Sequence, residues 1–168
     1  MSTVLELTDV HKTYGEFQAV TDMSFTIPAG SVCGLLGPNA AGKTTTIRMI
    51  LDIIRPTKGS ISIFGVPSAL QVRDRLGYLP EEKGLYKKMT ASSIIAYFAT
   101  LKGLGKKHAK RRAYELLERY GLKDFADEKT EALSKGMGQK VQVLASIAHE
   151  PDLVILDEPF SGRYPVNQ

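Results

Sequence analysis

The sequence contains one cysteine and no long apolar run. These two features limit the disulfide bonds and the membrane-spanning helices that the chain can form. Cys33 has no partner for a disulfide within the chain, which fits a reducing compartment, and its place in the apolar run SVCGLLG predicts a small core residue. No window reaches the roughly 18 uninterrupted apolar residues of a membrane helix, and the N-terminus lacks the basic start and apolar stretch of a signal peptide. We therefore expect a cytosolic chain, unless a partner holds it at a membrane.

Aromatic residues are absent from the one strongly basic segment, GKKHAKRR. The chain has a formal net charge of +4, and five cations lie within these eight residues: Lys106, Lys107, Lys110, Arg111 and Arg112. The ordinary interpretation is the solvated face of a helix, and contact with anionic lipid or nucleic acid is the alternative. Because single-strand binders normally combine basic residues with stacking aromatics, the missing aromatics disfavour nucleic acid.

The first 63 residues have the pattern of short strands around one helix. Residues 4–10 partly alternate, and two further sets follow a period of two: Met23, Phe25 and Ile27, then Ile61 and Ile63. These sets predict antiparallel strands. The run SVCGLLG predicts a continuous buried strand, and residues 43–54 predict a helix that Pro56 ends.

Residues 84–150 have a mostly helical pattern. Three apolar stripes recur at helical spacing and predict core packing: Ile94, Tyr97, Phe98 and Leu101; Ala109, Ala113, Leu116, Leu117 and Tyr120; Val141, Leu144, Ala145 and Ala148. Gly121 follows the second stripe as a helix stop. The run DLVILDE then predicts a fully buried strand, and its alternation with helices predicts an α/β fold with a parallel sheet covered on both faces.

A glycine-rich stretch between the predicted apolar strand and helix carries the strongest chemical signal. GPNAAGKTT fits the phosphate-binding pattern G-x-x-x-x-G-K-[ST] in the strand–loop–helix context that the pattern requires. Glycines let backbone N–H groups converge on phosphate oxygens, the lysine reaches the outer phosphates, and the threonine hydroxyl can ligate Mg²⁺. The predicted nucleotide-binding residues are Gly37, Pro38, Asn39, Ala40, Ala41, Gly42, Lys43, Thr44 and Thr45, with Thr44 also a metal ligand.

Two acids follow the last apolar run. Asp157 can hold Mg²⁺ through its water shell, and Glu158 can orient or deprotonate an attacking water, so we expect Glu158 to be the catalytic residue. A helix cap or a surface acid pair is the alternative. The apolar residues directly before the two acids favour placement at a sheet edge, and phosphate, metal and base together indicate hydrolysis of a nucleoside triphosphate.

A third motif, LSKGMGQKVQ, resembles the signature of ATP-binding cassette (ABC) proteins and precedes LDEP at the family's distance. The resemblance covers nearly the whole chain and implies ATP and Mg²⁺ as ligands. It also implies that Tyr14 stacks on adenine and that Glu81, where the family usually has glutamine, ligates the metal. The signature segment is implied to contact ATP held by an opposite copy, through Ser134, Lys135, Gly136 and Met137. The implied partners are a second nucleotide-binding subunit and a membrane permease, at the inner face of the cell membrane, in a bacterial export system.

The sequence departs from the family's pattern at several positions. Ala40 replaces a usual glycine, Lys135 and Met137 replace signature residues, and Arg163 and Tyr164 replace a leucine and the aspartate that couples the two sites. The chain also stops at residue 168, so the resemblance predicts one truncated nucleotide-binding domain that lacks the usual C-terminal strands. We expect residues 1–83 to form the β subdomain and P-loop core, residues 84–150 the helical subdomain, and residues 151–168 the strand with the two acids and the segment after it.

Two other functions remain compatible with these residues. One is a nucleotide-binding module that does not turn over, and the other is a soluble ABC-type ATPase acting on nucleic acid through the basic segment. A GTPase is disfavoured because the sequence contains no N-K-x-D segment for guanine recognition.

Overall fold

The computed structural model describes residues 2–38, 40–81 and 86–158. The chain divides into two compact units, Met1–Arg73 and Asp74–Gln168. Over the described residues the fold is α/β, with an antiparallel sheet and one α-helix in the first unit and a parallel strand pair with three α-helices in the second.

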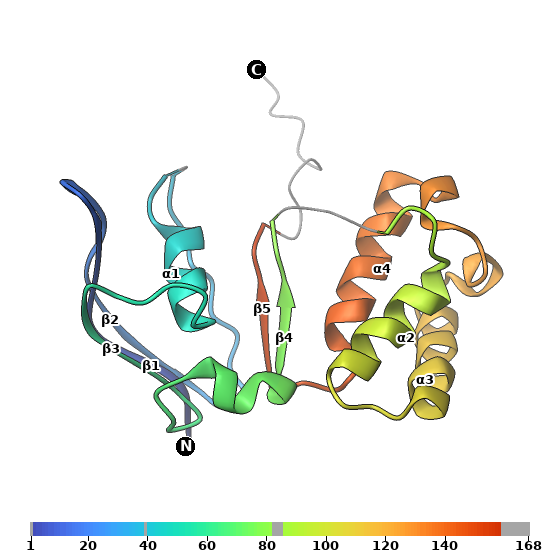
Figure 1. Cartoon of the computed structure of the whole chain (residues 1–168), viewed down its shortest axis with the longest axis horizontal. Coiled ribbons are helices and arrows are strands. Elements are labelled where there is room, and N and C mark those ends of the chain that lie inside the picture. Colours follow the sequence, from blue (N-terminus) through green and yellow to red (C-terminus); the bar gives the residue numbers. More distant parts are fainter. Residues whose placement is uncertain (1, 39, 82–85, 159–168) are drawn as a thin grey trace. The chain divides into compact units, whose positions relative to one another are not determined.

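The first unit is built on a three-stranded antiparallel sheet in the order β2-β1-β3 (Figure 1). Its strands are β1 (Thr3–Tyr14), β2 (Phe17–Pro28) and β3 (Lys58–Ile63), which confirms the predicted antiparallel strands. Alternation along β1 buries Leu5 and Leu7, and Ile63 of β3 pairs directly with Leu5. Helix α1 (Lys43–Ile50) buries Ile47, Met49 and Ile50 in the same unit.

Helix α1 ends four residues before the predicted end at residue 54. Asp52 adopts a left-handed backbone conformation with φ of 57°, which aspartate tolerates better than most residues. The N–H groups of Ile53 and Ile54 then both donate to the Arg48 carbonyl, at 2.9 and 3.3 Å. The sequence pattern missed this stop because an apolar period does not reveal a left-handed turn.

Residues 31–38 form neither a helix nor a strand, so the predicted buried strand over SVCGLLG is wrong for the described structure. Val32 and Leu36 are almost fully exposed, and Cys33 is exposed rather than part of a core. Strand propensity becomes a strand only where a neighbouring strand supplies hydrogen bonds, and no described strand pairs with this run. The run leads directly into the glycine-rich loop.

The second unit contains a parallel strand pair, β4 (Leu76–Leu79) and β5 (Leu153–Leu156). The parallel pairing is confirmed, but full burial of β5 is wrong, because Val154 and Leu156 are each 40% exposed. Strand β4 has only four residues and was not predicted. A Cβ atom at Gly77 would lie 2.4 Å from the Ser146 carbonyl oxygen, so glycine permits close packing of β4 against helix α4.

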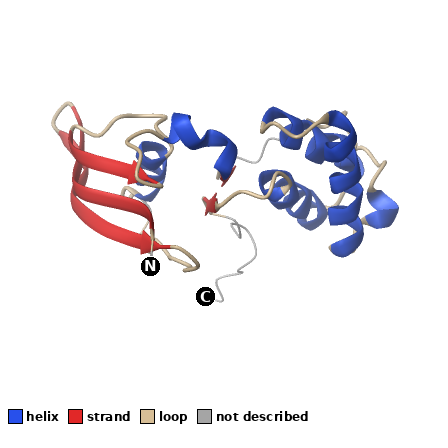
Figure 2. Cartoon of the chain, turned by 90° about the horizontal axis from the view of Figure 1, so that it is seen from below, coloured by secondary structure: helices blue, strands red, loops and turns tan. Residues whose placement is uncertain are grey.

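Three helices form the main core of the second unit (Figure 2). They are α2 (Ala91–Leu101), α3 (Lys106–Arg119) and α4 (Lys135–Ile147). Short 3₁₀ helices occur at Ala69–Arg75, Lys123–Phe125 and Thr130–Ala132. Among the described residues, no helix combines the length and the apolar character needed to cross a bilayer.

The helical stripes are confirmed in part. All four residues of the third stripe are buried, as are Ala109, Ala113, Leu116 and Leu117 of the second, and Gly121 follows α3 with φ of 73°. Four predicted core residues are instead exposed: Tyr97, Phe98, Leu101 and Tyr120. Ile94 of the first stripe is buried as predicted, and α2 buries Ala91, Ile95 and Ala99 in place of the stripe's other three residues, because the helix presents a neighbouring arc of its surface to α3 and α4.

Candidate functional site

The glycine-rich loop before α1 is shaped by two left-handed residues. Ala40 has φ of 65°, and Gly42 has φ of 81° and forms the N-cap of α1. The Ala41 N–H donates to the Pro38 carbonyl at 3.1 Å, which closes the turn. A Cβ atom at Gly42 would lie 2.4 Å from the Ala19 carbonyl oxygen, so the position requires glycine for both its conformation and its space. The predicted site residue Asn39 lies outside the described residues.

Lys43 holds its ammonium group over this loop. Its Nζ donates to the carbonyl oxygens of Gly37 and Pro38, at 2.8 and 2.9 Å. These two contacts fold the side chain back along the loop instead of letting it extend into solvent. A positive charge therefore lies beside the backbone that the sequence pattern assigns to phosphate binding.

The first turn of α1 has the donors that an anion needs. The N-cap Gly42 supplies no side-chain hydrogen bond, and no acidic residue lies in the first turn. The backbone N–H groups at a helix start and the positive end of the helix dipole favour a polyphosphate, and Thr44 in this turn has a hydroxyl of the kind that ligates Mg²⁺. Thr44 and Thr45 are half-buried, and the Thr46 hydroxyl donates to the Gly42 carbonyl at 2.9 Å, so Thr46 stabilises the turn. The residues of this segment fit Mg-nucleotide phosphates.

Tyr14 lies at the turn between β1 and β2, in the same unit as the loop. It pairs with Phe17 across the turn, its side chain is 49% exposed, and the Lys12 Nζ lies 5.1 Å from its ring centroid. Gly42 packs against Ala19 and Val20 of β2, only a few residues beyond this turn. About half of the Tyr14 side chain is therefore accessible to solvent.

The predicted acids follow the carboxyl ends of the parallel strand pair in the second unit. Leu79 of β4 pairs with Leu156 of β5, so Glu81 and Asp157 emerge at the same edge of this pair. Asp157 is only 3% exposed, and its N–H donates to the Leu79 carbonyl at 2.9 Å. Glu158 is exposed with φ of 52°, and Glu81 is also exposed.

The signature segment forms the start of α4, as predicted. Ser134 is the N-cap, and its Oγ accepts a hydrogen bond from the Met137 N–H at 3.3 Å. Ser134 and Lys135 are exposed, whereas Gly136 and Met137 are half-buried. The hydroxyl of Ser134 thus satisfies one free donor of the helix end and remains accessible to solvent.

The predicted site residues fall into two groups, one in each unit. The first unit holds Tyr14 and the loop of residues 37–45, and the second holds Glu81, residues 134–137, Asp157 and Glu158. The predicted departures Arg163 and Tyr164 lie outside the described residues.

A cluster that the sequence did not indicate lies on the sheet of the first unit. Asp9, His11 and Asp22 bring potential ligand atoms within 4.8 Å of one another. The Asp9 carboxylate already pairs with the Lys58 Nζ at 2.6 Å and the His11 Nε2 at 2.8 Å. The hydrogen bond from Lys58, with a smaller effect from His11, lowers the pKa of Asp9 to about 2. We interpret the cluster as an ion-pair network.

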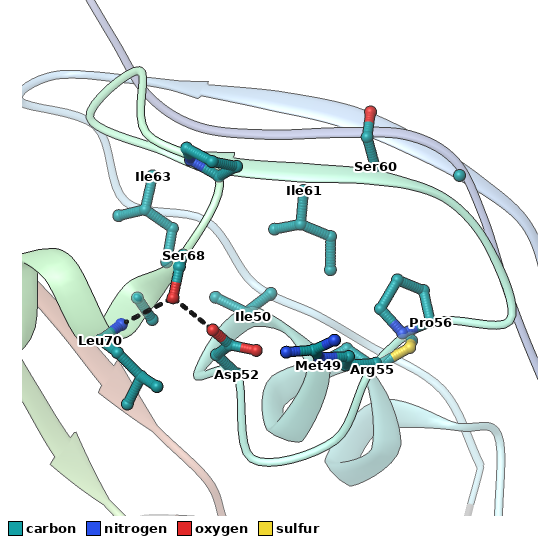
Figure 3. Close-up of a pocket in the computed structure, with 13 residues that line it drawn as sticks. Met49, Ile50, Asp52, Arg55, Pro56, Ser60, Ile61, Ile63, Ser68 and Leu70 are labelled. Carbon is teal, nitrogen blue, oxygen red and sulfur yellow. Dashed lines mark hydrogen bonds between the residues drawn. The ribbon is translucent and has the colours of Figure 1, made fainter.

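A separate cavity of about 420 Å³ opens in the first unit between α1 and β3 (Figure 3). Its apolar wall includes Ile50, Ile61 and Ile63, and the Ser68 hydroxyl donates to the Asp52 carboxylate at its edge. None of the predicted site residues that the structure describes lines this cavity.

Comparisons with known proteins agree with these motifs. Residues 20–161 match the family described as ABC transporter. The chain is 46% identical over 164 residues to the ABC transporter ATP-binding protein YhaQ of Bacillus subtilis, covering 98% of this chain and 55% of that protein. It is 37% identical to the bacitracin transport ATP-binding protein BcrA of Bacillus licheniformis, covering 99% of this chain and 54% of BcrA.

A solved structure, an ATP-binding subunit of an ABC transporter, superimposes with a TM-score of 0.84 at 34% identity. The match covers 97% of this chain and 69% of that one. The chain thus spans about half the length of the two curated relatives and more than two thirds of the solved one. With the family match extending over most of its residues, the chain belongs to the ABC transporter family of ATP-binding proteins.

Proposed function

We propose that the chain binds and hydrolyses Mg-ATP and that this reaction drives export through a separate membrane permease. The observation that carries the proposal is the loop before α1, where Gly42 has no room for a Cβ atom and the Lys43 ammonium is held over the loop backbone. Such a loop suits the phosphates of a nucleotide.

The loop backbone, the Lys43 side chain and Tyr14 have separate proposed roles in binding the nucleotide. Backbone N–H groups of residues 37–45 bind phosphate oxygens, and the Lys43 ammonium exchanges the carbonyls of Gly37 and Pro38 for the outer phosphates. Because those carbonyl contacts are between a cation and neutral acceptors, a charged phosphate is the stronger partner. Tyr14 stacks on the adenine ring with its exposed face.

The hydrolytic step requires a base and a metal-binding set. Glu158 is exposed and is proposed to accept the proton of the attacking water, while Thr44, Glu81 and Asp157 would hold Mg²⁺. When bound, Mg²⁺ neutralises charge on the phosphates. Asp157 is buried at the carboxyl end of β5, where a carboxylate suits a metal-binding role.

The signature residues are proposed to serve a second copy or a related subunit. These residues are the N-cap and first turn of α4, where the helix N-terminus and the exposed Ser134 hydroxyl favour phosphate: Ser134, Lys135, Gly136 and Met137. This role assumes a dimer in which each α4 faces the nucleotide of the opposite subunit.

The permease partner is supported by the relatives' names and by an exposed aromatic cluster. BcrA is named for bacitracin transport, and another relative, LnrL of Bacillus subtilis, is named for linearmycin resistance, which favours export. Tyr86, Tyr97 and Phe98 are exposed and stack edge to face, with centroid distances of 6.2 and 5.6 Å. We propose that this cluster within residues 84–150 docks a cytoplasmic segment of the permease, which would hold the chain at the inner membrane face.

Binding and turnover of ATP are tested separately on the purified chain. A fluorescent ATP analogue with Mg²⁺ should bind, and Lys43→Ala should weaken binding by about ten- to hundredfold because charge-assisted hydrogen bonds are lost. Lys129→Ala, which removes an exposed lysine elsewhere, is the matched control and should bind like the wild type.

Phosphate release then distinguishes an ATPase from a binding module. Glu158→Gln should retain nucleotide and lose turnover. Binding without any phosphate release by the wild type, and no effect of Glu158→Gln, would instead identify a module that does not turn over. Absence of nucleotide binding by the folded wild-type chain would refute the proposal as a whole.

A further inference from the structure

The basic segment of α3 contributes no residue to the proposed nucleotide site, and most of its cations are exposed. Lys106, Lys107, Lys110 and Arg111 are all exposed on the N-terminal half of α3, and we call them the α3 basic patch. Arg112, the fifth cation of this segment, is partly buried and pairs with Glu150 at 2.9 Å, so it is not part of the patch.

The lysines of the patch have few electrostatic partners. Within the described part of the chain, Lys106, Lys107 and Lys110 form no ion pair, and Arg111 contacts Glu115 at 3.5 Å. At 100° per residue, the four side chains of the patch project over an arc of roughly 140° of the helix. The patch is thus a compact positive face open to solvent.

The charges of the patch oppose the stability of the helix that carries them. The N-terminus of a helix favours negative charge, yet α3 has no acid in its first turn, begins with two lysines, and has Gly105 as an N-cap without a side-chain hydrogen bond. Lys106 and Lys110, like Lys107 and Arg111, are also like-charged pairs four residues apart. Helix stability therefore does not account for this arrangement.

We propose that the α3 basic patch binds the surface of an anionic phospholipid membrane. A flat, negatively charged surface suits a convex positive helix face, and juxtamembrane lysines contribute to binding at such surfaces. The apolar face of α3 is occupied within the core by Ala109, Ala113, Leu116 and Leu117, so no apolar side chains remain to insert. The contact is therefore electrostatic and sensitive to salt.

Nucleic acid fits this surface less well. No aromatic side chain lies among the four cations, and Tyr114, on the next turn of α3, uses its hydroxyl to donate to the Asp127 carboxylate at 2.5 Å. Stacking platforms, which normally accompany a basic groove for single strands, are therefore missing from the patch.

Co-sedimentation with vesicles tests the proposal without nucleotide or permease, so its outcome is independent of ATP binding. The wild-type chain should bind vesicles made of equal parts phosphatidylcholine and phosphatidylglycerol, and should not bind vesicles of phosphatidylcholine alone. Raising the salt concentration should release it.

Charge variants locate the contact. The triple variant Lys106→Gln, Lys107→Gln, Lys110→Gln should lose anionic-vesicle affinity on the order of a hundredfold, at about fivefold for each lysine. The matched control Lys87→Gln, Lys88→Gln, Lys129→Gln removes the same charge from exposed positions of the same unit and should lose much less. Circular dichroism checks that both variants keep their helices.

Three results would overturn the proposal. The first is equal binding of the wild type to neutral and anionic vesicles, or no binding to either. The second is an equal loss in the control variant, which would assign the effect to net charge alone. The third is displacement from anionic vesicles by a single-stranded oligonucleotide that binds more tightly through the same three lysines, which would assign the patch to nucleic acid.

Discussion

At the scale of single residues, the backbone of the glycine-rich loop is strained at Ala40, because a Cβ atom disfavours the conformation that this residue adopts. Ala40 has φ of 65°, a left-handed conformation that costs a residue with a Cβ atom roughly 1 to 2 kcal/mol. Glycine adopts the same conformation freely. The loop keeps this conformation because Gly42 and the Ala41–Pro38 hydrogen bond define the turn around it.

Relief of this strain is measurable. We expect Ala40→Gly to stabilise the chain by roughly 0.5 to 1 kcal/mol, because removal of the strain exceeds the extra entropy that glycine gives the unfolded chain. Ala41 does not have a positive φ, so Ala41→Gly should destabilise the chain by a similar amount. Urea unfolding of both variants checks the pair, and a loss of stability in Ala40→Gly would contradict the left-handed assignment.

His149 is a second residue whose environment has a testable consequence. Its Nε2 donates to the Leu76 carbonyl at 3.0 Å, and burial lowers its pKa from 6.5, with the Lys102 charge acting in the same direction. The unfolded chain therefore binds a proton at His149 more readily than the folded chain. The contribution of neutral His149 to stability is complete above pH 6.5 and is lost as the pH falls toward the lowered pKa.

We expect the free energy of unfolding to decline from neutral pH to about pH 5, and His149→Gln to reduce that decline. The glutamine amide can still donate to the Leu76 carbonyl but has no proton to gain in this range. His108→Gln changes an exposed histidine of α3 and should leave the wild-type decline in place. An unaltered pH profile for His149→Gln would show that this side chain does not titrate differently in the two states.

At the scale of the elements, α2 has a buried face and a separate aromatic face. Ile95 is fully buried in the helical core, whereas Leu101 is 62% exposed. We expect Ile95→Ala to cost about 3 kcal/mol through lost burial and a residual cavity, and Leu101→Ala to cost less than about 1 kcal/mol. Chemical denaturation compares the two, and similar losses would place Leu101 in the core, as its sequence spacing had predicted.

The elements also show what sequence periodicity can and cannot predict. The antiparallel strands, α3 and α4 follow their apolar patterns, because each has a covering partner nearby in the sequence. The short β4 gives too few residues for a pattern, and residues 31–38 have strand propensity without a described neighbouring strand. On α2, the stripe through Tyr97 and Leu101 and the one through Ile95 and Ala99 are both apolar, so spacing alone does not select the buried face.

The sequence predicts only those parts of the candidate site that depend on residues adjacent in the chain. The sequence located the loop of residues 37–45, the helix start at Ser134 and the strand before Asp157, because each depends on residues adjacent in the chain. The left-handed conformation of Ala40, the carbonyl contacts of Lys43 and the network around Asp9 depend on backbone geometry or on distant partners. No periodic pattern carries that information.

At the scale of the whole molecule, the described residues leave apolar surface without cover. Val32 and Leu36 are 102% and 92% exposed in a run that forms neither helix nor strand, and covering side chains of this size stabilises an assembly by roughly 1.5 to 3 kcal/mol each. Extended apolar segments with unpaired backbone groups are also templates for association between chains. We therefore predict that copies of the chain contact one another through residues 31–36.

We therefore expect the wild-type chain, without nucleotide, to self-associate as its concentration rises. The double variant Val32→Ser, Leu36→Ser should stay near the monomer mass of 18.4 kDa. The control variant Ile53→Ser, Leu101→Ser removes two other exposed apolar side chains, 59% and 62% exposed, that lie outside residues 31–36. Because these two positions lack the free backbone groups that would extend a sheet, the control should associate like the wild type. Sedimentation velocity over a concentration series separates the three proteins, and equal association by all of them would exclude residues 31–36 as the contact.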